Sequence, residues 1–245
     1  MRQNQVIGLV VLMALAVVLG SGLMVSAHCI WAETPLRVTV GETFALWAFY
    51  AHPDDPMDER EVTGLALWVH SPNGDQEAVA LTPRGTSEKA DITLTVAGEH
   101  TLVLERTPSR YWLQEIRDFG KSTVLVGDAE RIPGHVVNLP LEVVYLESAQ
   151  DGDRVTRVFQ VLYDGEALSG AEVEVFQSLE ATENLYEVVD EVETDASGRV
   201  SLVMDPIHAY VLETSHSVPS REVDGTGLFI TQVRFRSTLF LGASY

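Results

Sequence analysis

The sequence of 245 residues contains a single cysteine, Cys29, so no intramolecular disulfide can form and the fold must be held together by packing. Positive charge is scarce as well, because 16 Lys+Arg oppose 36 Asp+Glu and the formal net charge is -20. Nucleic-acid affinity depends on Lys and Arg that neutralise phosphates, so this composition argues against a nucleic-acid partner. The acidity either attracts cations or simply keeps the surface solvated. With 46% hydrophobic residues, the chain is not a disordered acidic tail.

Standard catalytic and metal-binding motifs are also absent. The sequence has no His-x-x-x-His, no Cys-x-x-Cys, no Gly-x-Ser-x-Gly, no phosphate loop and no dinucleotide fingerprint. A Ser-His-Asp triad, or a carboxylate pair for glycoside hydrolysis, could be assembled only by free choice among many residues. We therefore expect the protein not to be an enzyme.

The N-terminus carries the longest apolar run in the chain. Residues 6–20 are continuously apolar and follow a single Arg2, and residues 21–27 are rich in small side chains. This layout predicts a signal peptide over residues 1–27, cleaved after Ala27, so that the mature protein begins at His28. The alternative is an uncleaved anchor, since residues 6–25 are long enough to cross a bilayer of roughly 30 Å. Either way, we expect the remainder to be extracytoplasmic, in the periplasm or secreted.

From Trp31 onward, short alternating or β-branched runs recur between turn residues. They lie at residues 36–40, 43–50, 65–70, 77–81, 91–96 and 100–105, and then at 141–146, 154–163, 172–177, 186–193, 200–204, 209–214 and 229–241. This spacing predicts an all-β chain with two immunoglobulin-like antiparallel β-sandwich domains, residues 28–138 and 139–245. Residues 108–120 are less regular, and we expect the only helical turn of the first half there. The tight turn at residues 195–198 is expected to join two paired strands.

Two resemblances follow from these patterns. The turns at residues 163–173 and 194–200 resemble those of transthyretin-like modules of the carboxypeptidase regulatory type. The whole chain resembles a secreted bacterial family of unknown function, described as a nickel or cobalt uptake component. That resemblance rests on AHCIW at 27–31, VGE at 40–42, AH at 51–52, KSTVLVGD at 121–128, LPLEVV at 139–144, the two turns, and STL at 237–239. It implies metal capture for a membrane transporter. Cys29 and Tyr145 depart from the family pattern.

His28 is the strongest candidate metal ligand because of where cleavage would leave it. A mature N-terminal His offers its α-amine and its ring Nδ1 to one cation, and such nitrogen ligands suit copper and nickel. His52 is the first candidate for a second imidazole, since it ends a strand and opens an acidic loop at residues 52–59. Cys29 could add a thiolate, although a sequence neighbour points the opposite way in an extended strand. The alternative is that His28 and His52 are ordinary surface residues.

The other histidines are weaker candidates, being turn, strand or linker residues. They are His70, His100, His135, His208 and His216. The tryptophans are expected to be core or interface anchors, with a carbohydrate-binding stack as the alternative. They are Trp31, Trp47, Trp68 and Trp112. Two functions therefore stand: a metal-binding accessory protein for nickel, cobalt or copper uptake, or a non-catalytic immunoglobulin-like interaction module at the cell surface.

Overall fold

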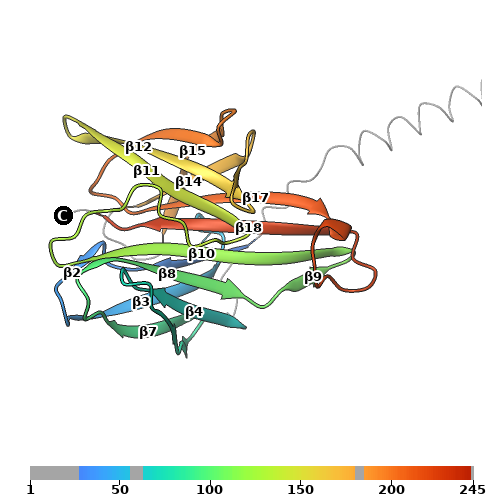
Figure 1. The fold of residues 1–245 in the computed structure, drawn as a ribbon, viewed down its shortest axis with the longest axis horizontal. Coiled ribbons are helices and arrows are strands. Elements are labelled where there is room, and N and C mark those ends of the chain that lie inside the picture. The colour runs from blue at the N-terminus through green and yellow to red at the C-terminus, as the bar shows by residue number, and fades with distance from the viewer. Residues whose placement is uncertain (1–27, 56–62, 180–184, 244–245) are drawn as a thin grey trace, which may run out of the picture.

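The computed structural model describes residues 28–55, 63–179 and 185–243 (Figure 1). Within these ranges, all regular structure is β-strand apart from one short 3-10 helix, η1 (Ser220–Glu222). The expected all-β fold class is therefore confirmed. The expected signal segment, residues 1–27, lies outside the described residues.

The strands form three sheets. The N-terminal sheet runs in the spatial order β1 (Cys29–Glu33), β3 (Thr43–Ala51), β7 (Ser87–Thr93) and β6 (Thr82–Arg84). The central sheet runs β15 (Tyr186–Glu193), β14 (Glu172–Ser178), β17 (Tyr210–Pro219), β18 (Gln232–Leu241), β10 (Gln114–Val126), β8 (Gly98–Arg106), β4 (Leu65–His70) and β5 (Gln76–Val79), with β2 (Arg37–Val38) and β9 (Ser109–Tyr111) also paired to β10. The C-terminal sheet contains β11 (Leu141–Asp151), β12 (Arg154–Tyr163), β13 (Glu166–Ala167) and β16 (Arg199–Met204).

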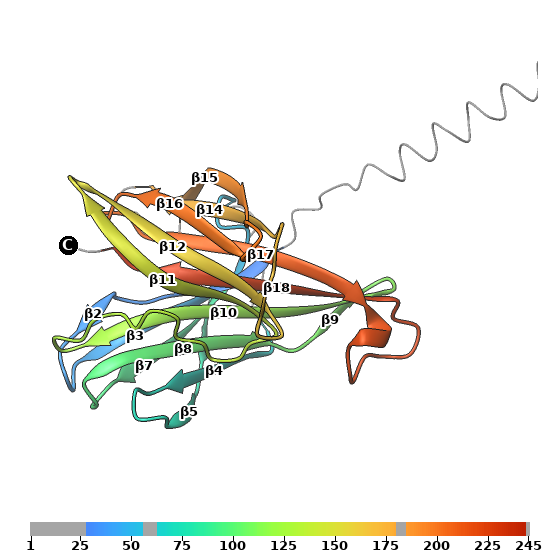
Figure 2. The same cartoon turned by 45° about the horizontal axis from the view of Figure 1, so that its top comes forward.

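Both smaller sheets pack on the central sheet, so the fold is two sandwiches with one sheet in common. On one side, Leu46 and Ile92 of the N-terminal sheet share a core with Leu102 of β8. On the other side, Phe159 of β12 shares a core with Leu212 of β17. Figure 2 shows β11 and β12 on one side of β10 and β18, and β3 and β7 on the other. Apolar side chains alternate along the strands of each outer sheet, so they lie on one face of that sheet. This face packs on the central sheet.

The central sheet is continuous because β10 and β18 pair in parallel. Their register runs from Gln114 opposite Gln232 to Ser122 opposite Phe240. The pairing of β10 with β2 is also parallel, whereas the other pairings in the described residues are antiparallel, as expected for sandwiches. The predicted boundary between residues 138 and 139 falls in the connection from β10 to β11. Whether the two halves are independent domains stays a prediction.

Strands β10 and β18 are covered on both faces, so their polar side chains need partners inside the protein. Arg236, which is 2% exposed, donates from Nε to Oδ1 of Asp118 at 2.5 Å. Lys121 donates from Nζ to Oε1 of Glu142 at 2.7 Å. Asp118 and Lys121 are three positions apart on one strand, so they point to opposite faces. Each face of the central sheet therefore contains one buried ion pair.

Three expectations about local structure are wrong. Residues 108–120 contain no helical turn; they form β9, a tight turn, and the first half of β10. Within this stretch Trp112 is not a core anchor, because 87% of its surface is exposed. The turn at residues 195–198 does not join two paired strands either. It connects β15, which pairs with β14, to β16, which pairs with β12. The chain crosses from the central sheet to the C-terminal sheet there.

Candidate functional site

The register of β1 and β3 brings His28 and His52 together. Cys29 pairs with Ala51 in antiparallel register, so the next residues outward, His28 and His52, face each other across the strand pair. Their ring centroids are 4.9 Å apart. The ring of Tyr50 lies 5.2 Å from that of His28. The two histidines predicted from the sequence to share a site are therefore neighbours, half-buried at the edge of the N-terminal sheet.

Cys29 lies in a different environment from the two imidazoles. It is fully buried, and it packs in a cluster with Trp31, Phe176 and Val211. Its thiol donates to the carbonyl of Ala51 at 3.7 Å. Burial, reinforced by Glu213, raises the pKa of the thiol well above its usual value. A metal ligand must be the thiolate, so this environment does not favour the predicted role of Cys29 as a third ligand.

The side chains at this site supply two nitrogen ligands and no more. Among the described residues, no group of three or more His, Cys, Asp and Glu side chains could hold a metal ion. A transition-metal site here would need the α-amine of His28, which exists only after cleavage at Ala27. The acidic loop is described as far as Asp55, and its remaining acids, Asp58 and Glu59, lie outside the described residues.

A chain of charged groups leads from the histidines into the central sheet. The Arg106 guanidinium lies 4.1 Å from the centre of the Tyr50 ring, a cation–π distance. Arg106 is also 3.3 Å from Oδ2 of Asp118, which pairs with Arg236. This row of contacts fixes the ring of Tyr50 beside His28.

Acidic side chains gather on the same face of the central sheet. Glu174 and Glu213 lie opposite each other on β14 and β17. Burial, with smaller effects from Asp54 and Glu191, raises the pKa of Glu174, whereas His52 lowers it. Burial also raises the pKa of Glu213 to about 7, although Arg236 opposes the shift. The surroundings of the histidines therefore favour a positively charged ligand.

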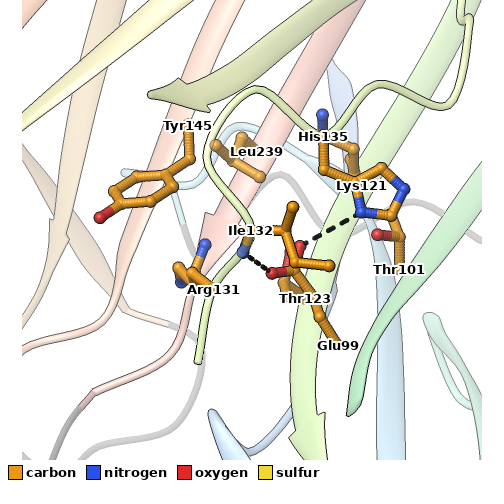
Figure 3. A pocket seen from close by; sticks show the side chains of 9 residues that line it. All are labelled: Glu99, Thr101, Lys121, Thr123, Arg131, Ile132, His135, Tyr145 and Leu239. Carbon is orange, nitrogen blue, oxygen red and sulfur yellow. Dashed lines mark hydrogen bonds and ion pairs between the residues drawn. The ribbon is translucent and has the colours of Figure 1, made fainter. Parts of the chain in front are cut away.

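A second polar site lies on the opposite face of β10, and the sequence analysis did not find it. Figure 3 shows a pocket lined by Glu99, Thr101, Lys121, Thr123, Arg131, Ile132, His135, Tyr145 and Leu239. Glu99 accepts a hydrogen bond from the backbone of Ile132 and lies 3.5 Å from Nδ1 of His135. Burial, and then Arg157, lower the pKa of Arg131 to about 10. These residues lie far apart in the sequence and carry no motif that could have revealed the pocket.

The remaining histidines have other neighbours. His70 lies 3.3 Å from the side-chain amide of Gln76, and Nε2 of His100 lies 2.8 Å from the carbonyl oxygen of Val96. The ring of His216 packs at 4.7 Å from that of Tyr163. In the described part of the chain, no helix is long and apolar enough to span a membrane.

Comparison with known proteins places the chain in a family. A family model described as a domain of unknown function, DUF4198, matches residues 25–218. No curated protein matches the chain. Similar solved structures include a DUF4785 family protein from Legionella pneumophila, with 12% identity and a TM-score of 0.31, and Escherichia coli alpha-2-macroglobulin activated by porcine elastase, with 14% identity and a TM-score of 0.30.

The similarity to the Legionella protein covers 75% of this chain and 51% of that one, and the similarity to the macroglobulin covers 89% and 20%. The chain thus spans about half of the first protein and a fifth of the second. Structural similarity at such low TM-scores supports no conclusion about the function of this chain. The family model, in contrast, covers most of the sequence and both halves of the fold, so the chain belongs to the DUF4198 family of domains of unknown function.

Proposed function

We propose that the protein is an extracytoplasmic metal-binding accessory protein, which captures nickel, cobalt or copper and passes it to a membrane transporter. The ligands are the α-amine and ring Nδ1 of His28, freed by cleavage after Ala27, and the imidazole of His52. Amine and imidazole nitrogens suit late first-row divalent metals. Cys29 is left out of the ligand set because it is buried in an apolar cluster.

The observation that carries this proposal is the 4.9 Å separation of the His28 and His52 rings. Imidazoles that share one ion bind it at about 2.0–2.1 Å, so two rings at this spacing need only small rotations to reach a common metal. The formal net charge of -20 on the whole chain raises the concentration of cations around it.

Calorimetric titration with nickel, cobalt and copper tests the proposal. The protein is exported without a tag, and its N-terminus is sequenced to establish that it begins at His28. We expect His28→Ala, His52→Ala and a chain with one extra residue before His28 each to weaken binding at least tenfold. His208→Ala is the matched control and should bind like the wild type. If His28→Ala binds all three metals as tightly as the wild type, the proposal is wrong.

The second candidate function is a non-catalytic immunoglobulin-like interaction module. It is favoured by the sandwich fold together with the lack, among the described residues, of any group of three or more His, Cys, Asp and Glu side chains that could hold a metal ion. Under this alternative, His28 and His52 are structural and the exported protein binds no transition metal. The titration therefore separates the two functions.

A further inference from the structure

Large apolar side chains gather at one end of the molecule. Trp112 and Leu113 form the turn between β9 and β10, with exposures of 87% and 54%, and Tyr111 precedes them. Leu228 and Phe229, in the connection from β17 to β18, are 87% and 86% exposed. Figures 1 and 2 both show β9 and this connection together at the narrow end of the fold. We call these five residues the aromatic tip.

The two loops of the aromatic tip are fixed to each other. The backbone of Thr231 donates to the carbonyl of Leu113 at 2.8 Å. The side chains of Gln114 and Gln232 are hydrogen-bonded at 2.9 Å where β10 and β18 begin. The Arg110 guanidinium lies against Gly227, so it brings the first loop into contact with the second. The exposed side chains are therefore held on a common support.

The backbone at the tip is in a conformation that bulky residues avoid. In the described residues, four non-glycine residues have positive φ, and two of them are Trp112 at 56° and Phe229 at 72°. The other two are Asn138 and Asp164, whose short polar side chains tolerate this region. A two-residue hairpin turn normally uses Asn or Gly at such positions. The fold thus accepts strain at the two most exposed aromatic residues, a pattern typical of functional sites.

The tip differs in charge from the rest of the protein. Its two segments, residues 107–117 and 219–232, carry three arginines and three carboxylates, a formal sum of zero, whereas the whole chain is at -20. Two of these arginines have solvent-exposed side chains, Arg110 at 60% and Arg221 at 82%, and they lie 3.8 Å and 3.6 Å from the carboxylates of Glu115 and Glu222. Cationic side chains beside apolar ones suit lipid phosphates. A strongly acidic end would instead be repelled by an anionic bilayer.

We propose that the aromatic tip inserts into the headgroup region of a phospholipid bilayer. Trp and Tyr prefer the interface between membrane and water, where Phe and Leu reach the acyl chains. The narrow convex end offers five side chains on two loops, which suits shallow insertion better than the wide, complementary surface of a protein interface. The surface shares no residue with the histidine pair and does not depend on metal binding.

Tryptophan quenching by vesicles of phosphatidylcholine, brominated near the headgroup and prepared with and without phosphatidylglycerol, tests this proposal on the exported protein. Of the four tryptophans, Trp31 is 2% exposed, Trp47 and Trp68 are partly buried, and Trp112 is 87% exposed. The share of the quenching that Trp112→Phe removes therefore reports on the tip, and a chain that begins at His28 is used so that the apolar N-terminus cannot bind the vesicles. We expect the wild type to be quenched and Trp112→Phe to bind vesicles with most of the quenching lost.

Phe229→Asn and Trp112→Asn change the tip without harming the backbone, because Asn tolerates positive φ. Burial of one large apolar side chain is worth a factor of about ten or more in an equilibrium constant. We therefore expect Phe229→Asn to raise the lipid concentration for half-maximal quenching about tenfold. Trp112→Asn should raise, by a similar factor, the lipid concentration at which half of the protein sediments with the vesicles. Ile207→Asn, at the opposite end of β17 and 57% exposed, should change neither readout.

Two outcomes would overturn the proposal. One is tryptophan emission that brominated lipid leaves unchanged, or that Phe229→Asn does not affect. The other is an aromatic tip that becomes shielded only when a soluble protein partner is added, which would identify a protein-binding surface instead.

Discussion

Replacing Trp112 by Asn should make the protein more stable, although it removes a large apolar side chain. Trp112 has a φ of 56°, and the left-handed region costs an ordinary L-residue about 1–2 kcal/mol. Asn tolerates that region, so most of this cost is relieved. The side chain contributes little in return, because it is 87% exposed and its nearest aromatic ring contact, with Tyr111, is at 6.4 Å. That contact is worth about 0.5 kcal/mol.

The balance is a gain of about 0.5–1.5 kcal/mol in the free energy of unfolding. For a chain of this size, such a gain raises Tm by about 1–5 °C. Trp112→Ala is the matched comparison, because it removes the same side chain but lacks the short polar group that lets Asn tolerate positive φ. The difference between the two variants in urea unfolding therefore isolates the backbone contribution. If Asn and Ala destabilise the protein equally, the turn is not strained and Trp112 contributes packing. A variant that gains stability while losing lipid binding would show that the strain serves the tip.

Two further predictions concern buried charge. Asp118→Asn should lower the free energy of unfolding by about 3 kcal/mol, because it removes the carboxylate that is hydrogen-bonded to the buried Arg236 and leaves Glu213 as its remaining acidic neighbour. Asp91→Asn, in an exposed pair with Lys89 at 2.8 Å, should cost less than about 1 kcal/mol, and similar losses in urea unfolding would refute the burial argument. Glu213, with a folded-state pKa of about 7 against an ordinary 4.5, holds a proton that the unfolded chain releases, so its contribution to stability is lost as the pH rises from about 4.5 to 7. Glu213→Gln should therefore stabilise the protein by about 3 kcal/mol at pH ~8 and by much less at pH ~5, and a gain independent of pH would contradict this assignment.

Strands covered on one face could be predicted from the sequence. In β3, buried and partly exposed side chains alternate from Phe44 onward, and the expected strand at residues 43–50 matches it. The same alternation marks β16, where Val200, Leu202 and Met204 point inward. Local periodicity is sufficient in such strands because the pattern of burial is itself local.

Strand β10 is absent from the strands predicted from the sequence, and both of its faces are covered. Its first residues include Glu115, Arg117 and Asp118, which read as a polar, irregular segment. Asp118 is buried only because Arg236 of β18 lies beside it, and that partner is more than a hundred residues away in the sequence. The turn at residues 195–198 failed for a related reason. Its glycine marks a tight turn correctly, but the partners of the strands on either side are set by long-range packing.

The candidate site shows the same division between local and long-range information. His28 and His52 could be chosen from the sequence, because one follows the expected cleavage position and the other opens an acidic loop at the end of an expected strand; that they lie on paired strands is known only from the structure. The pocket around Glu99 and Lys121 could not, since its residues come from separate strands and a connecting loop. The aromatic tip was missed because aromatic residues are usually buried, so Trp112 was expected in a core.

The position of β18 makes the folding of the two halves of the chain interdependent. It follows every other strand in the sequence, yet it lies in the middle of the central sheet, between β17 and β10. Its apolar side chains complete the core under the C-terminal sheet, and its Thr238 donates to the carbonyl of Ile30 in β1 at 2.6 Å. Neither half can therefore be completed before the last strand is present. Such non-local pairing makes folding slow.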